Sequence, residues 1–200
     1  MVQSLSQPAS LSPRFQRLKE VLSQPNQSRL KERVEATVGL MLLEHGADVE
    51  TLLIQRTERH DDPWSGQVGL PGGRVKESDG SIRSALHREV MEEVGVDLSS
   101  DGEELGPLSV GHPMRRLEMK VQPWVYALRI RPLVSIGPEV SSAFWVSLPT
   151  LPSKRTKRDV FIRGERWTVQ CFLVDGKVVW GFTYRVLTEL IQVPGFLSGI

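Results

Sequence analysis

The chain has 200 residues, of which 40% are hydrophobic and 24% are charged, a balance typical of one globular domain. Its 25 basic and 24 acidic residues leave a formal net charge of +1, so no overall field favours nucleic acid or an anionic membrane as a partner. The single cysteine, Cys171, excludes an internal disulfide and a cysteine-based zinc site. Because no apolar run reaches the roughly 18 residues of a membrane span and no secretory pattern opens the chain, we expect a cytoplasmic protein without a membrane partner.

The order of hydrophobic and turn-forming residues predicts alternating strands and helices. Residues 1–33 are expected to form a tail with a short amphipathic helix over 14–22, and residues 34–200 the main domain. Strands are predicted by β-branched and apolar runs that end at glycine or polar turns. They cover 34–43, 51–56, 121–130, 143–148, 159–163, 169–174 and 177–179. A glycine- and proline-rich loop over 60–73 leads into a helix over 81–94, and a last helix is predicted over 183–192.

Three glutamates crowd one stripe of the helix predicted over 81–94. At about 100° per residue, Glu89, Glu92 and Glu93 lie on one side, next to an apolar stripe that packs inward. Like charges one turn apart repel on a bare helix, so a nearby cation is expected to offset the repulsion. Arg88 is one candidate, and a hard divalent ion such as Mg²⁺ or Mn²⁺ is another, because such ions take carboxylate oxygen. Taken alone, this run is also typical of a solvated acidic face.

The residues before this helix favour a metal or phosphate site over a solvated acidic face. The loop ends in Leu70-Pro71-Gly72-Gly73, whose small residues let a phosphate chain or a metal approach the main chain closely. Together, loop and helix resemble the Nudix box, G-x5-E-x7-R-E-U-x-E-E-x-G-U, where U is aliphatic. The second half, from Arg88 to Val96, matches completely.

The first half of the box departs from the usual form. Its glutamate position holds Gly80, the spacing from Gly73 to Arg88 is one residue longer, and the nearest acid is Asp79. A longer box with aspartate, after a Gly66-Gln67 pair, resembles the coenzyme A pyrophosphatase subgroup. That subgroup commonly has histidine where this chain has Trp64.

The resemblance covers roughly residues 34–192 and implies a fold and an activity. The implied fold is α/β, a Nudix-like α/β/α sandwich with a mixed central sheet. The implied activity is divalent-metal-dependent cleavage of a pyrophosphate bond in coenzyme A or a related ADP-containing compound. ADP-ribose, dinucleoside polyphosphates and nucleoside triphosphates are alternative substrates. A non-catalytic nucleotide- or RNA-binding module is an alternative of another class.

The resemblance also assigns roles to the box. Glu89 and Glu93 are expected to bind Mg²⁺ or Mn²⁺ directly, Glu92 to hold a further ion, and Gly73 to offer its carbonyl. Arg88 is expected to orient a box carboxylate. Glu139, in the turn before a strand, competes with a box glutamate for the role of general base, and a solvent-facing turn residue is the alternative.

Other residues are candidates for binding the substrate. Arg74 and Arg116 are expected to meet phosphate, although a surface loop explains either of them as well. Trp64 either stacks on a base or closes the loop onto the core. The basic cluster formed by Lys154, Arg155, Lys157 and Arg158 favours a solvated face over RNA binding. We expect a small nucleotide-containing substrate, no nucleic acid partner, and edge strands that allow a homodimer.

Overall fold

The computed structural model describes residues 10–24, 34–60, 64–114, 116–162 and 164–197. Within these residues a seven-stranded sheet runs in the order β3-β2-β1-β6-β5, with β4 also beside β1 and β7 beside β2. The seven strands are β1 (Ala36–His45), β2 (Asp48–Arg56), β3 (Val68–Gly69), β4 (Gly72–Arg74), β5 (Gly102–Pro107), β6 (Val121–Leu128) and β7 (Val140–Ser147). Because β1 and β6 are parallel and the other pairs are antiparallel, the central sheet is mixed, as predicted.

Strand β1 shows why this sheet needs cover on both sides. Successive side chains of a strand point to opposite faces. Leu40 and Leu42 belong to one buried cluster, and Met41 and Leu43 belong to another. A strand that is apolar on both faces is stable only between two layers, so the sheet must lie in the middle of the molecule.

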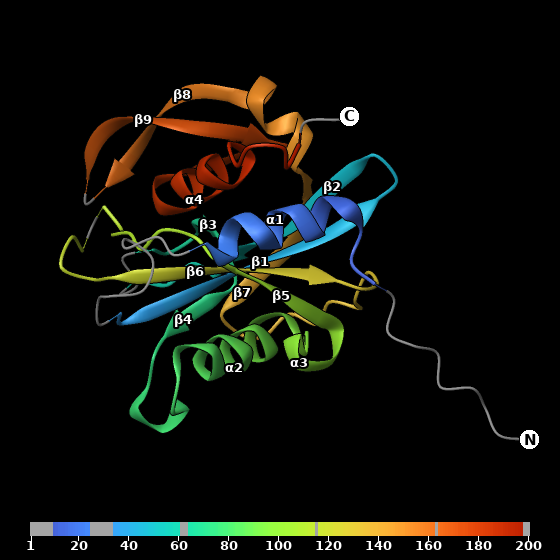
Figure 1. Ribbon diagram of the computed structural model, residues 1–200. Helices are drawn as coiled ribbons and strands as arrows, with labels where there is room; N and C mark the ends of the chain where they lie inside the picture. Colours follow the sequence, from blue (N-terminus) through green and yellow to red (C-terminus); the bar gives the residue numbers. More distant parts are fainter. Residues whose placement is uncertain (1–9, 25–33, 61–63, 115, 163, 198–200) are drawn as a thin grey trace, which may run out of the picture.

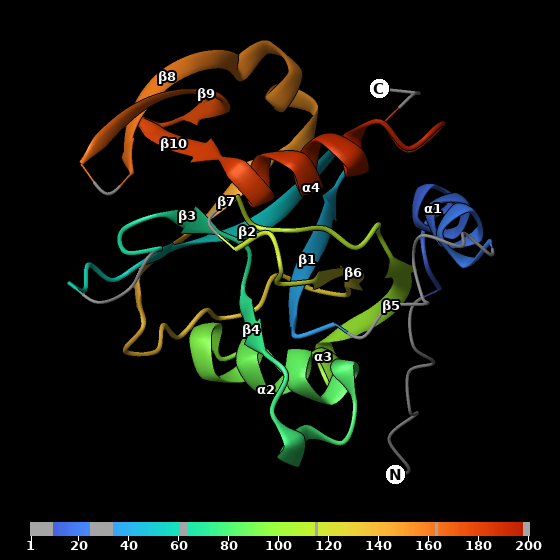
Figure 2. The same ribbon diagram turned by 90° about the vertical axis from the view of Figure 1, so that its left-hand side faces the viewer.

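The two covering layers differ in composition (Figures 1 and 2). Helices α2 (Ile82–Val94) and α3 (Leu98–Asp101) cover one face. The other carries α1 (Pro13–Ser23), α4 (Gly181–Ile191) and a separate three-stranded sheet. Its strands are β8 (Arg155–Ile162), β9 (Glu165–Val174) and β10 (Lys177–Trp180). The predicted sandwich is therefore confirmed.

Helix α2 is built as its sequence predicts. Its apolar stripe, Leu86, Val90 and Val94, is fully buried against the sheet. The Ser81 hydroxyl accepts a hydrogen bond from the backbone N–H of Ser84 at the start of the helix. Gly95 ends the helix in the left-handed region, with φ of 69°, and donates to the carbonyl of Met91. This ordinary helix fixes the direction of the acidic face.

Several boundaries differ from the predictions. Strand β5 was not predicted, because its sequence GEELGP lacks the β-branched residues that favour strands. Strands β3 and β4 lie inside the predicted loop over 60–73, held there by pairing with β2 and β1. Strand β8 begins at Arg155 rather than at 159, so most of the basic cluster lies on it.

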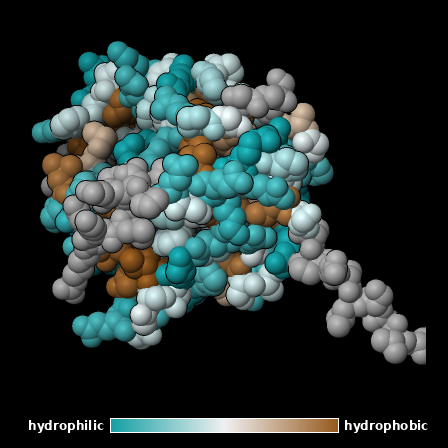
Figure 3. All heavy atoms as spheres, viewed as in Figure 1, coloured by the Kyte–Doolittle hydropathy of each residue, from teal (hydrophilic) through white to brown (hydrophobic). Residues whose placement is uncertain are grey.

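The amino-terminal helix is part of the packed molecule. Its Phe15, Leu18 and Leu22 are buried in the same cluster as α4, so it extends the core. No helix among the described residues is long and apolar enough to cross a membrane. The face seen in Figure 3 is mostly hydrophilic, with scattered hydrophobic spots.

Candidate active site

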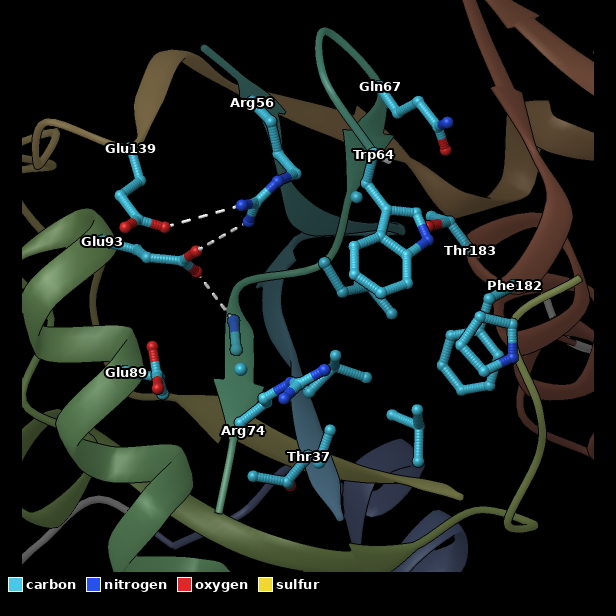
Figure 4. A pocket seen from close by; sticks show the side chains of 18 of the residues that line it. Thr37, Arg56, Trp64, Gln67, Arg74, Glu89, Glu93, Glu139, Phe182 and Thr183 are labelled. Atoms are coloured by element: carbon cyan, nitrogen blue, oxygen red, sulfur yellow. Dashed lines mark hydrogen bonds and ion pairs between the residues drawn. The ribbon is translucent and has the colours of Figure 1, made fainter. Parts of the chain in front are cut away.

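A cavity of about 700 Å³ opens between α2, the short strand β4 and the start of α4. Its lining has two chemically different ends. The acidic end carries Glu89, Glu92, Glu93 and Glu139; the aromatic end carries Trp64, Phe182, Met114, Met119 and Val121. Figure 4 shows the labelled rings on the far side of the cavity from Glu89 and Glu93. The predicted box carboxylates and Glu139 are therefore brought together.

Glu93 is the most buried acid of the site, with 4% of its surface exposed. One carboxylate oxygen accepts a hydrogen bond from the Gly72 N–H at 2.7 Å, and the other lies 3.6 Å from Arg56 (Figure 4). Burial raises the pKa of Glu93 to about 7, and the Gly72 hydrogen bond and Arg56 oppose this rise. A pKa of about 7 means that the Glu93 carboxyl group changes between its neutral and ionised forms near neutral pH.

Two adjacent glycines let β4 fit between β1 and α2. At Gly73, a Cβ atom would lie 2.5 Å from the carboxyl carbon of Glu89. At Gly72, φ is 144° and a Cβ would lie 2.3 Å from the carbonyl oxygen of Thr37. A side chain at Gly72 would push β4 away from the backbone of β1, and one at Gly73 would displace the carboxylate of Glu89. The glycine pair therefore sets the contact between Glu89 and the main chain.

Arg88 organises the outer part of the acidic face. It donates to both carboxylate oxygens of Asp79, at 2.7 and 3.0 Å, in a bidentate pair. This pairing lowers the pKa of Asp79 to about 2. The third guanidinium nitrogen, Nη1, donates to Glu89 at 2.8 Å and to Glu92 at 3.2 Å. Arg88 thus holds two box carboxylates.

The longer spacing in the first half of the box has a simple structural counterpart. Residues Glu77–Asp79 form a single 3₁₀ turn, and Gly80 follows it in the left-handed region with φ of 69°. The Asp79 carboxylate also accepts from the Lys76 N–H at 2.7 Å. This tight turn absorbs the additional residue and points the acid at Arg88.

Glu139 approaches the site from the loop before β7 and lies next to Glu93 (Figure 4). The loop before β7 is tied to α2, because the Gly137 N–H donates to the Glu93 carbonyl at 3.0 Å. The Glu139 side chain is half exposed and lies 3.5 Å from Arg56 and 3.4 Å from Arg59. Arg56 therefore bridges Glu93 and Glu139 (Figure 4). Neither arginine was predicted, since Arg56 ends β2, Arg59 lies in the segment after it, and neither belongs to a recognisable motif.

The residues proposed to contact substrate fall in two places. Arg74 and Trp64 line the cavity. The guanidinium of Arg116 instead lies over the Trp64 ring, 5.5 Å from its centre, and Arg116 is not among the lining residues. Phe182 and Thr183 line the cavity from the first turn of α4 and were not predicted as site residues. Apolar residues near a helix start carry no functional signal in a sequence.

The chemistry of the acidic end fits a hard divalent cation. Among the residues that the structure describes, no three acidic, histidine or cysteine side chains are already arranged as a metal site. The box carboxylates are instead paired with arginines: Glu89 and Glu92 with Arg88, and Glu93 with Arg56. Nevertheless the available donors are oxygen atoms, and Glu93 is a desolvated carboxylate that a cation would stabilise.

Comparison with known proteins agrees with this geometry. The NUDIX domain model matches residues 33–164. A Nudix hydrolase NudL of Citrobacter koseri is 30% identical over 153 residues, which cover 70% of this chain and 72% of that protein. An uncharacterized protein of Schizosaccharomyces pombe is 50% identical over 50 residues, or 25% of this chain and 15% of that protein.

Among solved structures, a MutT/nudix family protein from Enterococcus faecalis has a similar fold. The match has a TM-score of 0.50 and 18% identity, and covers 90% of this chain and 74% of that one. The sheet order, the glycine pair and the acidic helix all lie within the matched family segment. The chain therefore belongs to the NUDIX domain family and is a Nudix-type hydrolase.

Proposed function

We propose that the protein is a divalent-metal-dependent pyrophosphohydrolase, and that its substrate is coenzyme A or a related ADP-containing compound. The observation that carries this proposal is the two-ended cavity, in which four glutamates and an aromatic surface share one space. A metal-bound pyrophosphate suits the first end, and the organic part of a nucleotide suits the second. None of Glu89, Glu92 and Glu93 is replaced, which disfavours a purely binding module; Gly80 at the first glutamate position of the box is the one departure in its favour.

The box supplies the metal ligands in this proposal. Glu89 and Glu93 bind Mg²⁺ or Mn²⁺ directly, Glu92 holds a further ion, and the Gly73 carbonyl completes the set. When bound, the ions shield phosphate charge and lower the pKa of coordinated water. Arg88 keeps Glu89 and Glu92 in place through its hydrogen bonds at 2.8 and 3.2 Å.

Glu139 is our first candidate for the group that accepts the proton of the attacking water. It lies in the loop before β7 at the acidic end of the cavity, and its half-exposed carboxylate is accessible to water. Two arginines, Arg56 and Arg59, lie within 3.5 Å of the Glu139 carboxylate and hold it at the acidic end. Glu92 is the competing candidate, since it also lines the cavity but is held by Arg88.

The preference for coenzyme A rests on the lengthened box with Asp79 and on the Gly66-Gln67 pair. Coenzyme A carries a 3′-phosphate, a dianion that is costly to bury unpaired. Arg74 is the first candidate to meet it, because it lines the cavity, and Arg116 at the outer face of Trp64 is the second. The basic strand β8 contributes no lining residue, so the RNA alternative has less support.

A hydrolysis screen tests this function directly. Purified protein would be given coenzyme A, dephospho-coenzyme A, ADP-ribose, NADH, dinucleoside polyphosphates and nucleoside triphosphates, each with Mg²⁺ or Mn²⁺. We expect coenzyme A to be cleaved to 3′-phosphoadenylate and to be preferred over dephospho-coenzyme A. Arg74→Ala should erase that preference, and so should Arg116→Ala if that side chain makes the contact.

The alternatives give distinct results in the same screen. Brisk turnover of ADP-ribose or a nucleoside triphosphate without coenzyme A cleavage would reject the coenzyme A proposal but leave the hydrolase proposal intact. Equal rates on coenzyme A and dephospho-coenzyme A would remove the 3′-phosphate contact. No metal-dependent cleavage of any of these compounds would contradict the proposed function.

A further inference from the structure

Strand β8 is the outer edge of the three-stranded sheet, whose order is β10-β9-β8. Figures 1 and 2 show it on the outside of the molecule. Among the described residues, β9 is the strand that pairs with it, through eight consecutive residue pairs. The other edge of β8 therefore offers a row of backbone N–H and C=O groups on which a further strand can pair.

The sequence of β8 has few of the features that protect an edge strand from pairing. Protected edges are commonly short, bulged or interrupted by proline. Strand β8, RTKRDVFI, has eight residues, no proline, and an unbroken register with β9. Its last three residues are apolar, and the side chain of Phe161 is 72% exposed. A long edge with an exposed apolar end favours pairing with another strand.

The outer half of the β8–β9 hairpin has only two strands. Strand β10 pairs with β9 from Cys171 to Val174, so residues 165–170 pair with β8 alone. This half is exposed on both faces, because Trp167 is 46% exposed and lies on the face opposite Phe161. A two-stranded ribbon is marginally stable on its own, and a further strand beside β8 would stabilise it.

The charges of β8 indicate which strand fits its edge. Lys157 and Asp159 lie two residues apart on one face of the strand. If a second β8 pairs antiparallel around a two-fold axis at Arg158, Lys157 of each copy lies opposite Asp159 of the other. The same register places Arg155 opposite the exposed ring of Phe161.

Neighbouring registers fit less well. An axis at Asp159 would place two carboxylates opposite each other and would lose both ion pairs. An axis at Lys157 would place two ammonium groups opposite each other and would leave Phe161 outside the pairing. The register at Arg158 has one like-charged pair, formed by Arg158 with its own copy, and this pair lies on the other face from the ion pairs.

We propose that β8 pairs antiparallel with β8 of a second copy of this chain, around a two-fold axis at Arg158, so that the two three-stranded sheets become continuous. An interface with this symmetry closes on itself and gives a dimer. It supplies backbone partners for the open edge and a third strand for the outer half of each hairpin. Strand β8 contributes no residue to the cavity, so the inference is independent of the proposed function.

Cysteine cross-linking of the whole protein tests the register. Residues that face each other across antiparallel strands have Cα atoms about 4.5–5.5 Å apart, within the reach of a disulfide. Arg158→Cys should therefore give a covalent dimer under mild oxidation, seen on a non-reducing gel. Asp159→Cys is the matched control, because its two copies would lie about 8 Å apart on a diagonal, which is beyond that reach. The native Cys171 is buried and should not react.

Sedimentation equilibrium tests the ion pairs. Asp159→Lys places a lysine opposite Lys157 twice in the dimer, and should weaken association at least about 5-fold. Adding Lys157→Asp to this variant should restore most of the affinity, because each pair again has opposite charges. Both variants lose the hydrogen bond that Thr168 donates to Asp159 at 2.6 Å, so this loss cannot explain a difference between them.

Three results would overturn the proposal. The first is a chain that sediments as a monomer at every concentration up to its solubility limit. The second is a dimer that Asp159→Lys leaves unchanged and that Arg158→Cys does not cross-link, since such a dimer uses another surface. The third is cross-linking of Asp159→Cys in preference to Arg158→Cys, which would move the register and remove the ion pairs.

Discussion

The two ends of the cavity are assembled in opposite ways. At the acidic end, Glu89, Glu92 and Glu93 come from two turns of one helix, and Asp79 and Arg88 support them from the same short segment. At the aromatic end, Trp64 and Phe182 come from a loop and from the last helix, and meet only in the folded chain. Apart from Glu139, the acidic residues are therefore local in sequence, whereas the aromatic residues are not.

The two ends also differ in their effect on folding. Burying the rings removes apolar surface from water and stabilises the fold. Burying Glu93 has the opposite effect, since its raised pKa means that the ionised form is disfavoured in the folded protein. The buried acid therefore opposes stability where the buried rings support it. The predictions below exploit this difference.

The largest effect is expected from neutralising the acidic end. Glu89→Gln and Glu93→Gln should each reduce turnover at least about 100-fold, because each removes charge stabilisation at a phosphoryl centre. Steady-state kinetics with saturating Mg²⁺ measures this loss. Glu77→Gln is the matched control, since Glu77 is an exposed acid of the 3₁₀ turn beside the box and does not line the cavity. Near-normal turnover in both box variants, with metal still bound, would contradict the assignment.

The same Glu93→Gln change should stabilise the metal-free protein at alkaline pH. Because burial raises the pKa of Glu93 from an ordinary 4.5 to about 7, its ionisation costs folding free energy that appears as pH rises from 4.5 through 7. At pH 8 the variant should gain on the order of 3 kcal/mol, the equivalent of that shift.

Urea denaturation with a metal chelator, at pH 5 and at pH 8, tests this expectation. The free energy of unfolding of Glu93→Gln should exceed that of the parent by a small amount at pH 5 and by a large amount at pH 8. If the variant is no more stable than the parent at pH 8, the fold compensates the charge of Glu93.

A pH dependence of the opposite sign is expected at Asp79. Arg88 lowers the pKa of Asp79 to about 2, so the pair contributes stability above the ordinary pKa of 3.8 and loses it as pH falls toward 2. Asp79→Asn should lower the melting temperature at pH 7 by a few degrees and should have little effect near pH 2. Melting curves across this range measure the difference. A constant difference at every pH would mean that Asp79 acts through packing and not through its charge.

The smallest effect on turnover is expected from residues that lie outside both ends of the cavity. Lys157 and Arg158 lie on β8, which contributes no residue to the cavity. Lys157→Ala and Arg158→Ala should therefore change turnover of a small substrate by less than about twofold, as exposed charges far from a site usually do. A large loss of turnover, or an RNA affinity that falls steeply with salt and depends on these side chains, would revive the RNA alternative.

The sequence by itself determined the local features. The spacing of apolar residues placed α2 within one residue of its observed start, and Gly95 gave its end. The order of carboxylates and Arg88 along that helix followed from 3.6 residues per turn. Such features depend only on neighbours in the chain, so a pattern is enough to predict them.

Tertiary structure decided the rest. Strand β5 forms because β6 offers a partner, although its own sequence has little strand preference. Arg56 joins Glu93 to Glu139, and α4 brings Phe182 beside Trp64, through contacts between segments far apart in the chain. The pKa of Glu93 likewise depends on how much water the fold excludes, which no spacing of residues in the sequence records. The acidic helix could therefore be predicted from one segment, whereas the shape and charge of the cavity exist only after the layers have packed.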